Sequence, residues 1–388
     1  MAKTIYKKKI KNGKEYYFYR LRHENLKTPK DIYAKTVKEL EEKIKNIKYD
    51  LEHDIVNNKE CFETFFTDWL FDVHFSHLKP STKENYEGVY RMYVKNSSLS
   101  KIKVKDLKLI DIQKFYNNLV SNGCTIIRIK NIHKIIRPFV RYLYNNNVIV
   151  KDFSASIVLP KEDEKTKLAK ENKIIPFTLD EEKKFLSAIN GHHLEMLFVT
   201  ALYSGLRQGE LFALTWDDIN FEKAYIDVNK TYRYIADVSR DGRSSGYNSI
   251  QTPKTTKSIR KVPIPQFLLK MLLQYRNDQR LQKIKYADIY QDNNLVFCNK
   301  LGAYLVDSTV ARQYKIILKN NKIPMRKFHD MRHTFATRLF ELGEEPKTVQ
   351  ELLGHSTVSI TLNTYTHVLE AVKQNAISKL DELHSILK

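Results

Sequence analysis

The amino-acid sequence predicts an α+β chain of several domains: a small three-stranded sheet with one helix, an all-helical domain, and a larger mixed α/β domain. Its 388 residues are too many for one ordinary core. From Cys61 onward, apolar residues follow the spacing of helices rather than the alternation of strands. A charged run, KEDEKTKLAKEN, follows Pro160 and has the composition of an exposed linker. We therefore expect domains over 1–58, 59–155 and 174–388, with a linker over 156–173.

The charge of the chain indicates nucleic acid as its partner. It has 66 lysine and arginine residues against 45 acidic ones, a formal charge of +21 and a pI near 9.5, which attracts a polyanion. On charge alone, a basic protein without such a partner remains the alternative. The three cysteines lie far apart without a CxxC pair, so neither a zinc site nor a disulfide framework is indicated. The first residues, MAKTIYKKKI, contain no apolar signal core, and we expect a soluble cytoplasmic protein without metal or other cofactor.

The first domain combines a hairpin signal with basic and aromatic residues. Two runs rich in aromatic and β-branched residues flank Asn12-Gly13, a pair that strongly favours a hairpin. A third strand is expected near residue 32, and Thr36 with Glu39 forms a capping box that opens a helix. The first fifty residues hold 15 basic and 7 acidic residues. A basic aromatic face of this sheet suits a DNA groove, although half of the aromatic side chains must fill the small core.

The second domain is expected to be helical. Between Ile129 and Leu143, apolar residues recur at helical spacing, and most basic residues fall elsewhere on the helix. One face therefore packs in the core, and the other is basic, which suits DNA or simply solvent. Pro138 interrupts the pattern, because a proline inside a helix removes a hydrogen bond, and we expect a kink or a split near Arg137.

Three segments of the last domain carry residues suited to chemistry: GLRQGEL at 205–211, HDMRH at 329–333 and LGHSTVSITLNTYTH at 353–367. Together they resemble the tyrosine recombinase, or phage integrase, family over the whole catalytic half. The small basic sheet domain and the long loop before QTPKTTKS look most like integrases of conjugative transposons and related prophages. The resemblance implies an enzyme that integrates and excises a mobile element through a 3′-phosphotyrosyl intermediate and a four-way junction. It also implies arm-binding, core-binding and catalytic domains, in that order.

Two arginines in these segments suit phosphodiester chemistry independently of the family. Displacing an oxygen from phosphorus without a metal requires fixed positive charge around the phosphoryl oxygens. A guanidinium stays charged and donates two parallel hydrogen bonds, so Arg207 and Arg332 are expected to clamp the phosphate. Glu210 lies three residues after Arg207, on the same side of a helical turn, where it can orient the guanidinium. The resemblance gives Glu210 the same structural position.

The resemblance also implies the nucleophile and two histidine roles. Tyr365 lies ten residues after His355 and is the nucleophile. Its phosphotyrosyl ester stores the energy of the broken bond, so no ATP is needed. His329 shares a helix face with Arg332 and assists proton transfer from the attacking hydroxyl. His355 hydrogen-bonds the scissile phosphate.

A lysine-rich turn holds two candidates for the general acid. Lys254 lies between a strand that ends near Thr252 and another that starts near Arg260, which places it on a hairpin tip. The resemblance puts the general-acid lysine at such a tip, where it can give its proton to the departing 5′ oxygen of DNA. Lys257 is the alternative, because spacing does not determine which side chain points inward.

The end of the chain and its partners follow from the same resemblance. After Tyr365, apolar residues recur at helical spacing: Leu369, Val372, Ala376, Leu380, Leu383 and Leu387. This tail helix packs either on its own domain or, as the resemblance implies, on a neighbouring subunit of a homotetramer on DNA. The implied partners are double-stranded DNA at core and arm attachment sites, an excisionase and host proteins that bend DNA, with no membrane.

Two other functions fit the same residues. A relaxing topoisomerase of type IB character shares the arginine, histidine and tyrosine chemistry, but relaxation does not need a separate basic first domain. A catalytically inactive relative that acts as a DNA-binding regulator or architectural protein is not expected to keep every catalytic residue type.

Overall fold

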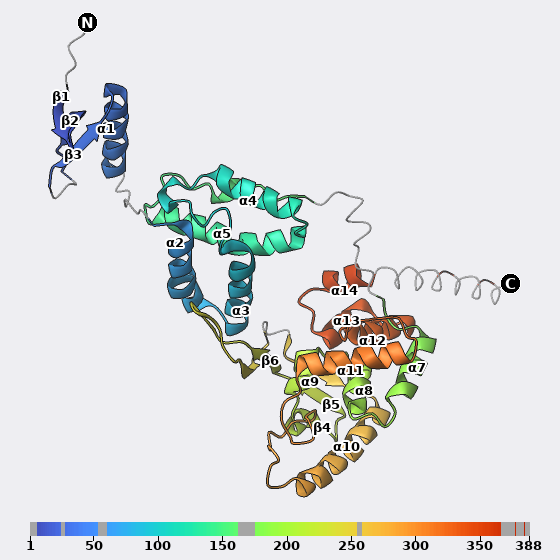
Figure 1. The fold of residues 1–388 in the computed structure, drawn as a ribbon. Coiled ribbons are helices and arrows are strands. Elements are labelled where there is room, and N and C mark those ends of the chain that lie inside the picture. The colour runs from blue at the N-terminus through green and yellow to red at the C-terminus, as the bar shows by residue number, and fades with distance from the viewer. Residues whose placement is uncertain are drawn as a thin grey trace. The chain divides into compact units, whose positions relative to one another are not determined.

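The computed structural model describes residues 6–24, 28–52, 60–161, 175–253 and 258–365, together with Ile377 and His384. Its internal contacts divide the chain into two units, residues 1–169 with 236–245, and residues 170–235 with 246–388 (Figure 1). Three of the sequence expectations fall mostly or wholly outside the described residues: the linker, the two candidate lysines and the tail helix.

A three-stranded antiparallel sheet begins the first unit, as the sequence predicts. Its strands, in spatial order, are β1 (Lys7–Lys11), β2 (Lys14–Leu21) and β3 (Lys30–Ala34), and helix α1 (Val37–Glu52) contacts β2 and β3. The turn between β1 and β2 has positive φ at both Asn12 (52°) and Gly13 (72°), a conformation that favours this residue pair. The hydroxyl of Thr36 accepts the Glu39 N–H and caps α1.

The two faces of this sheet carry different residues. Tyr17 and Tyr19 pack against the buried cluster that joins the sheet to α1. On the other face, the Lys9 ammonium lies 3.8 Å from the ring centre of Phe18, and the Lys11 ammonium lies 4.6 Å from that of Tyr33. Alternate aromatic residues of β2 therefore fill the core, and the others join lysines on a basic aromatic face, here defined as Lys9, Lys11, Phe18 and Tyr33.

After residue 60, the first unit is mainly helical. This confirms the prediction of a helical second domain. Its longer helices are α2 (Phe62–Asp68), α3 (Pro80–Val89), α4 (Leu109–Ser121) and α5 (Ile126–Asn145). Helix α5 contains Pro138 and is continuous, so the split expected near Arg137 is wrong. Ile136 and Phe139 beside the proline are fully buried, and their packing outweighs the hydrogen bond that proline removes.

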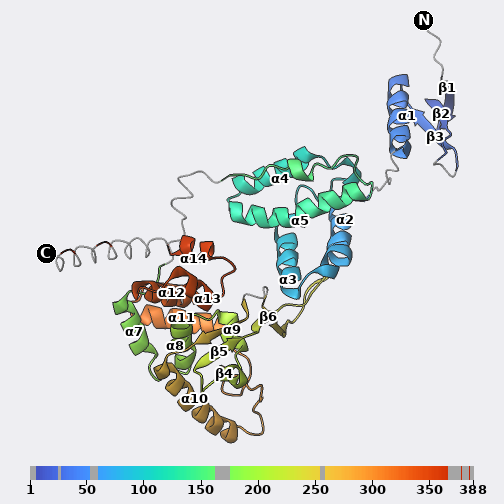
Figure 2. The same ribbon diagram turned by 180° about the vertical axis from the view of Figure 1, so that it is seen from behind.

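The second unit mixes helices with short antiparallel strands, as predicted. Figure 2 shows it from behind. The helices are α7 (Leu179–Ile189), α8 (Glu195–Ser204), α9 (Gln208–Ala213), α10 (Gln266–Lys285), α11 (Asp307–Asn320), α12 (Asp330–Glu341), α13 (Pro346–Leu353) and α14 (Val358–Thr364). One sheet has the order β10 (Arg260–Pro263), β5 (Tyr225–Val228), β4 (Ile219–Asn220), and another pairs β6 (Thr231–Ile235) with β9 (Tyr247–Gln251).

A short hairpin, β7 (Val238–Ser239) with β8 (Gly242–Arg243), lies between β6 and β9 in sequence and groups with the first unit. Strand β9 ends at Gln251, and strand β10 begins at Arg260. These ends agree with the two strands expected on either side of the lysine-rich turn. Among the described residues, no helix is long and apolar enough to cross a membrane.

Candidate active site

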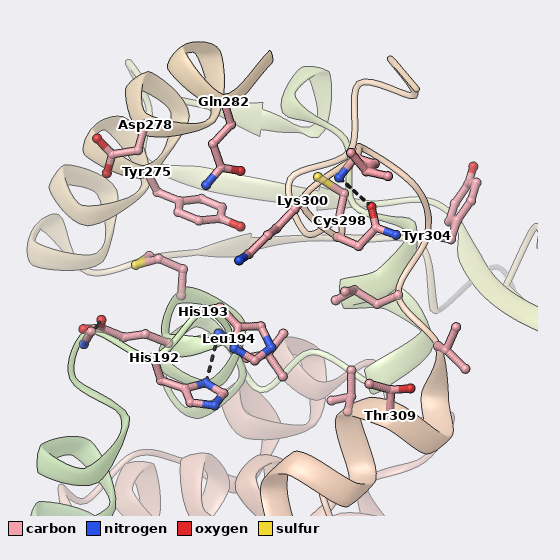
Figure 3. A pocket seen from close by; sticks show the side chains of 18 of the residues that line it. His192, His193, Leu194, Tyr275, Asp278, Gln282, Cys298, Lys300, Tyr304 and Thr309 are labelled. Carbon is pink, nitrogen blue, oxygen red and sulfur yellow. Dashed lines mark hydrogen bonds between the residues drawn. The ribbon is translucent and has the colours of Figure 1, made fainter. Parts of the chain in front are cut away.

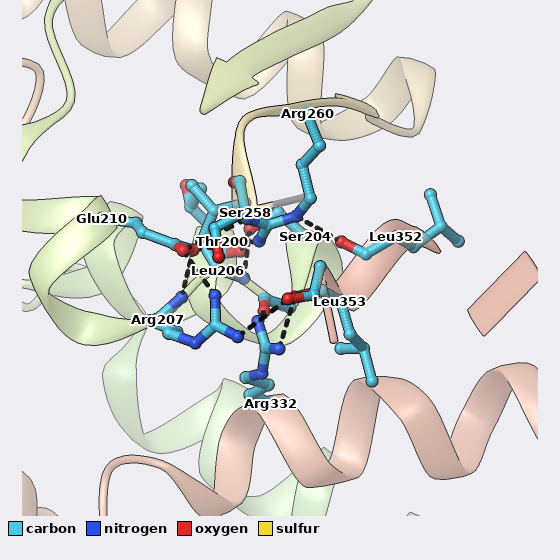
Figure 4. A network of polar contacts seen from close by, with 12 residues as sticks. Thr200, Ser204, Leu206, Arg207, Glu210, Ser258, Arg260, Arg332, Leu352 and Leu353 are labelled. Atoms are coloured by element: carbon cyan, nitrogen blue, oxygen red, sulfur yellow. Dashed lines mark hydrogen bonds and ion pairs between the residues drawn. The ribbon is translucent and has the colours of Figure 1, made fainter. Parts of the chain in front are cut away.

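The backbone around Gly205 positions both arginines. Gly205 ends α8 with φ of +62°, and a Cβ at this position would lie 2.4 Å from the Phe335 ring, so a larger residue does not fit. Arg207 follows at the start of α9. From α12, the Arg332 guanidinium donates to the Gly205 carbonyl at 2.7 Å and to the Leu353 carbonyl. The turn after α8 therefore brings the two guanidinium groups to one place (Figure 4).

Arg332 is the more deeply buried of the two arginines. Only 3% of the residue is exposed. Burial, together with the charge of Arg207, lowers the pKa of Arg332 to about 9, which leaves its guanidinium charged at neutral pH. Arg207 donates to the Gly354 carbonyl at 3.2 Å. Main-chain carbonyls thus orient both cations, and those of Arg332 do so without an opposing charge.

Glu210 holds Arg207 as the sequence predicts. Its carboxylate accepts from the Arg207 guanidinium at 2.8 Å and from the Arg207 N–H at 2.9 Å. It also accepts two hydrogen bonds, at 3.1 and 2.9 Å, from the buried side chain of Arg260 in β10, which sequence reasoning did not identify. Burial alone raises the pKa of Glu210, but the hydrogen bonds and charge of Arg260 and the charge of Arg207 outweigh it and bring the pKa to about 2.

A pocket of about 580 Å³ lies over this network, and five of the seven predicted site residues line it. These five are Arg207, Glu210, His329, Arg332 and His355. His329 stands at the N-terminus of α12, and His355 follows Gly354, which ends α13 with φ of +65°. Lys254 and Lys257 lie outside the described residues, but the described neighbours on either side, Pro253 and Ser258, both line the pocket.

Tyr365, the seventh predicted residue, is packed in a separate cluster. Its side chain is fully buried among α12 and α13 residues, with its ring centre 5.5 Å from that of Phe340. Its hydroxyl lies 2.8 Å from Nδ1 of His333, a second residue that sequence reasoning missed. Burial raises the pKa of Tyr365 above its ordinary value. The phenol is therefore neutral, and its hydroxyl has the His333 nitrogen as hydrogen-bond partner. The spacing of His333, four residues after His329 on the same helix face, is the signal in the sequence from which it could have been found.

The histidines of the site have lowered pKa values, although His333 and His355 are only partly buried and His329 is exposed. Burial comes first among the causes, followed by the charges of Arg332 and Arg207, and together they lower the pKa of His355 to about 3. Burial, His329 and Arg332 lower the pKa of His333 to about 4. Burial and the same two arginines also lower the pKa of His329. A bound phosphate adds negative charge, and we expect it to oppose these shifts.

We expect the free protein to lose stability as the pH falls below about 6.5. The unfolded chain then binds protons at His333 and His355, whereas the folded chain, with pKa values of about 4 and 3, does not. Each histidine lowers the free energy of unfolding by up to about 1.4 kcal/mol per pH unit until the pH reaches its folded-state pKa. Urea denaturation at pH 7.0 and 5.0 measures the loss. His333→Asn with His355→Gln should reduce it, and His77→Gln, at an exposed position, should not. An unchanged loss in the double variant would contradict the pKa assignments.

A second pocket in this unit, of about 790 Å³, shares no lining residue with the first. His192 and His193 lie on one side of it, and Tyr275 and Lys300 on another (Figure 3). Within the described part of the chain, no group of three or more His, Cys, Asp or Glu side chains is placed to hold a metal ion. The arginine-lined pocket is therefore the one in which the predicted site residues gather.

Comparisons with known proteins identify related sequences. The sequence pattern of the phage integrase family matches residues 177–371, and that of the phage integrase N-terminal SAM-like domain matches residues 61–120. A "Tyrosine recombinase XerC-like" protein of Caldanaerobacter subterraneus subsp. tengcongensis is 40% identical over 96% of this chain and 98% of its own length. The ICEBs1 integrase of Bacillus subtilis is 26% identical over 81% of this chain and 82% of its own.

Solved structures show the same fold. The Tn1549 transposon integrase in complex with a circular intermediate DNA matches with a TM-score of 0.63 at 22% identity, over 83% of this chain and 99% of that one. A lambda integrase tetramer bound to a Holliday junction matches with a TM-score of 0.54 at 19% identity, over 90% and 95% of the two chains. These matches cover more of the chain than the catalytic part alone, so the likeness in fold also includes the helical domain before it.

Proposed function

This chain belongs to the phage integrase family and is a site-specific tyrosine recombinase, and we propose that it cuts and rejoins DNA through a covalent link to Tyr365. The observation that carries the proposal is the convergence of Arg207 and Arg332 on one pocket with two neutral histidines. Its relatives include integrases and transposases of mobile elements, which supports integration and excision as the reaction. The comparisons lend no support to the topoisomerase or inactive-regulator alternatives.

The two arginines supply the electrostatic part of the reaction. A phosphodiester in the pocket gains charge on its non-bridging oxygens as the attacking oxygen approaches. Arg207 and Arg332, held in place before the DNA arrives, stabilise that charge with little reorganisation. Glu210 positions Arg207 rather than contacting phosphate, because its oxygens already accept from Arg207 and Arg260. His355 donates a hydrogen bond to the scissile phosphate in this proposal.

The covalent step exchanges one phosphate ester for another. A bond forms between the Tyr365 oxygen and phosphorus, and the bond from phosphorus to the 5′ oxygen breaks, which leaves a 3′-phosphotyrosyl link. The phenol loses a proton and the 5′ oxygen gains one. Because one ester replaces another, a second DNA strand can reverse the step without an energy source.

The direct test is to identify the linked residue. The protein is incubated with a nicked duplex from the end of its host element, so that the cleaved fragment is lost and the covalent intermediate accumulates. After digestion, mass spectrometry of the DNA-linked peptide is expected to place the adduct on Tyr365. An adduct on another of the 23 tyrosines, or no adduct at all, would refute the proposal.

We further propose that Lys254 is the general acid, with Lys257 as its competitor. Pro253 and Ser258, at the two ends of this segment, line the pocket, which supports a lysine acting there. Sulfur in place of the 5′ oxygen leaves without a proton, because a thiolate is a good leaving group. Lys254→Ala is therefore expected to cut normal DNA about 10²–10⁴-fold more slowly and sulfur-substituted DNA at a near-normal rate. Equal loss on both substrates would point to structural damage, and a rescue seen only with Lys257→Ala would reassign the role.

The sheet of residues 1–58 is proposed to bind arm-type DNA. Its basic aromatic face, with lysines over Phe18 and Tyr33, supports contact with phosphates and sugars of a groove. Lys9→Ala with Lys11→Ala should weaken arm-DNA binding and reduce the salt slope of log K by up to about 2, since each phosphate contact contributes about 0.9. The matched control is Lys45→Ala with Lys48→Ala, which removes equal charge from exposed positions of α1. Equal weakening by both pairs, or loss of core cleavage, would contradict this assignment.

The assembly is proposed to be a homotetramer on DNA, with residues 59–155 binding core sites and 174–388 carrying the catalytic residues. The likeness in fold to a lambda integrase tetramer bound to a Holliday junction supports this arrangement. The tail helix, which lies outside the described residues, would bury its apolar stripe on a neighbouring subunit. On this proposal the enzyme acts on cytoplasmic DNA, with an excisionase and DNA-bending host proteins as partners.

A further inference from the structure

Helix α12 places three functional side chains within two turns. His329 lines the phosphate pocket, and Arg332 is anchored beside it. His333 follows one turn after His329, with the two rings edge to face and their centres 4.9 Å apart. On its other side, Nδ1 of His333 lies 2.8 Å from the Tyr365 hydroxyl. His333 thus stands between a pocket residue and the proposed nucleophile.

Both partners of this hydrogen bond are neutral at neutral pH. The groups that face His333 are His329 and Arg332 from α12, Tyr365 after α14, and His355 after α13. Burial and the charged or polar neighbours lower the pKa of His333 to about 4, so its ring is neutral. The phenol keeps its proton, because burial raises the pKa of Tyr365. In the tautomer with the ring proton on Nε2, Nδ1 accepts from the Tyr365 hydroxyl, and this is the tautomer that the inference uses.

We propose that His333 accepts the phenolic proton of Tyr365 during strand cleavage. The proposal rests on Tyr365 being the nucleophile. As the Tyr365 oxygen bonds to phosphorus, its proton passes to Nδ1 of His333, while the 5′ oxygen leaves with a proton from the general acid. On rejoining, the imidazolium returns its proton to the phenol oxygen. The resemblance assigned proton transfer to His329, but the atom within hydrogen-bond distance of the phenol belongs to His333.

Binding of DNA favours this transfer. Arg332 is among the causes that keep His333 neutral in the free protein. A phosphodiester that pairs with Arg332 supplies a negative charge near both groups and makes the imidazolium easier to form. The same phosphate is the electrophile, so the base becomes stronger in the complex in which it is needed. If the Tyr365–His333 hydrogen bond served only to satisfy a buried hydroxyl, a change in the basicity of His333 on DNA binding would have no effect on catalysis.

The test uses single-turnover cleavage of a nicked duplex by His333→Leu, His333→Asn and a control. Leucine removes both ring nitrogens, and the expected loss is about 10²–10⁴-fold. Asparagine places an amide oxygen near the Nδ1 position that accepts the hydrogen bond but not the proton, so His333→Asn should stay about as slow as His333→Leu. Recovery of most of the rate would show that the ring only positions the phenol. The control is Thr337→Val, one turn further along α12, where the buried hydroxyl has no hydrogen-bond partner within the described residues. DNA affinity and thermal unfolding confirm that each variant is folded.

The pH profile separates a proton acceptor from a structural residue. Without His333, hydroxide must remove the phenolic proton, so the rate of His333→Leu should rise about tenfold per unit between pH 7 and 9 relative to the wild type. A ratio to wild type that stays constant with pH, a rate at or above wild type, or an equal loss in Thr337→Val would each overturn the inference. An adduct that persists in Tyr365→Phe would instead refute the nucleophile itself, so the two failures are distinguishable.

Discussion

Tyr365→Phe is expected to lower covalent adduct formation by more than about 10⁵-fold, because a phenyl ring has no oxygen to attack phosphorus. The fold should tolerate the change. The ring lies in an apolar cluster with Phe340 and Leu353, and phenylalanine fills the same space. The cost is one buried hydrogen bond to His333, about 1 kcal/mol. Core-DNA affinity should therefore remain within about twofold of wild type, as measured by gel shift beside the denaturing-gel assay for the adduct.

Tyr314→Phe is the matched control for this variant. Tyr314 is also fully buried in the second unit, and its hydroxyl has no hydrogen-bond partner among the described residues. Removing that hydroxyl should leave adduct formation unchanged. If both variants lose the adduct, general damage to the unit explains the loss. If Tyr365→Phe retains a denaturation-resistant complex, the nucleophile lies elsewhere.

Glu210→Ala is expected to be strongly destabilising as well as inactive. The change leaves Arg260, whose side chain is only 6% exposed, without its carboxylate partner and close to the Arg207 charge. Removing one partner of a buried ion pair costs about 3–5 kcal/mol, because the other charge stays buried. Arg207 also loses two hydrogen bonds that orient it. Urea denaturation measures the stability, and nicked-duplex cleavage measures the activity.

Two further variants distinguish the effect of Glu210 on stability from its role in positioning Arg207. Glu341→Gln breaks a more exposed ion pair of α12 with Arg338, and we expect a loss of no more than about 1 kcal/mol. Glu210→Leu combined with Arg260→Met removes both buried charges and should recover much of the stability, yet stay inactive because Arg207 is no longer held. If Glu210→Ala is as stable as Glu341→Gln, the buried pair does not stabilise the fold. If the double apolar variant cleaves DNA normally, Glu210 has no positioning role.

Local signals in the sequence determined the elements and most of the pocket. Asn12-Gly13 predicted the hairpin because only a few residues adopt positive φ at both positions of the turn. Arg207 with Glu210, and His329 with Arg332, were predicted as pairs because residues three positions apart lie on the same side of a helix. These are short-range constraints, and a sequence records them directly.

Tertiary structure alone decided the partners that lie far apart in the chain. Arg260 reaches Glu210 only because β10 is brought against the start of α9, across fifty residues of sequence. Tyr365 meets His333 because α14 packs on α13, which packs on α12, and burial is the largest cause of the shifted pKa of both groups. Pro138 stays inside a continuous α5 because buried neighbours hold the helix. In each case the deciding energy comes from packing and desolvation between distant segments, and no local pattern encodes it.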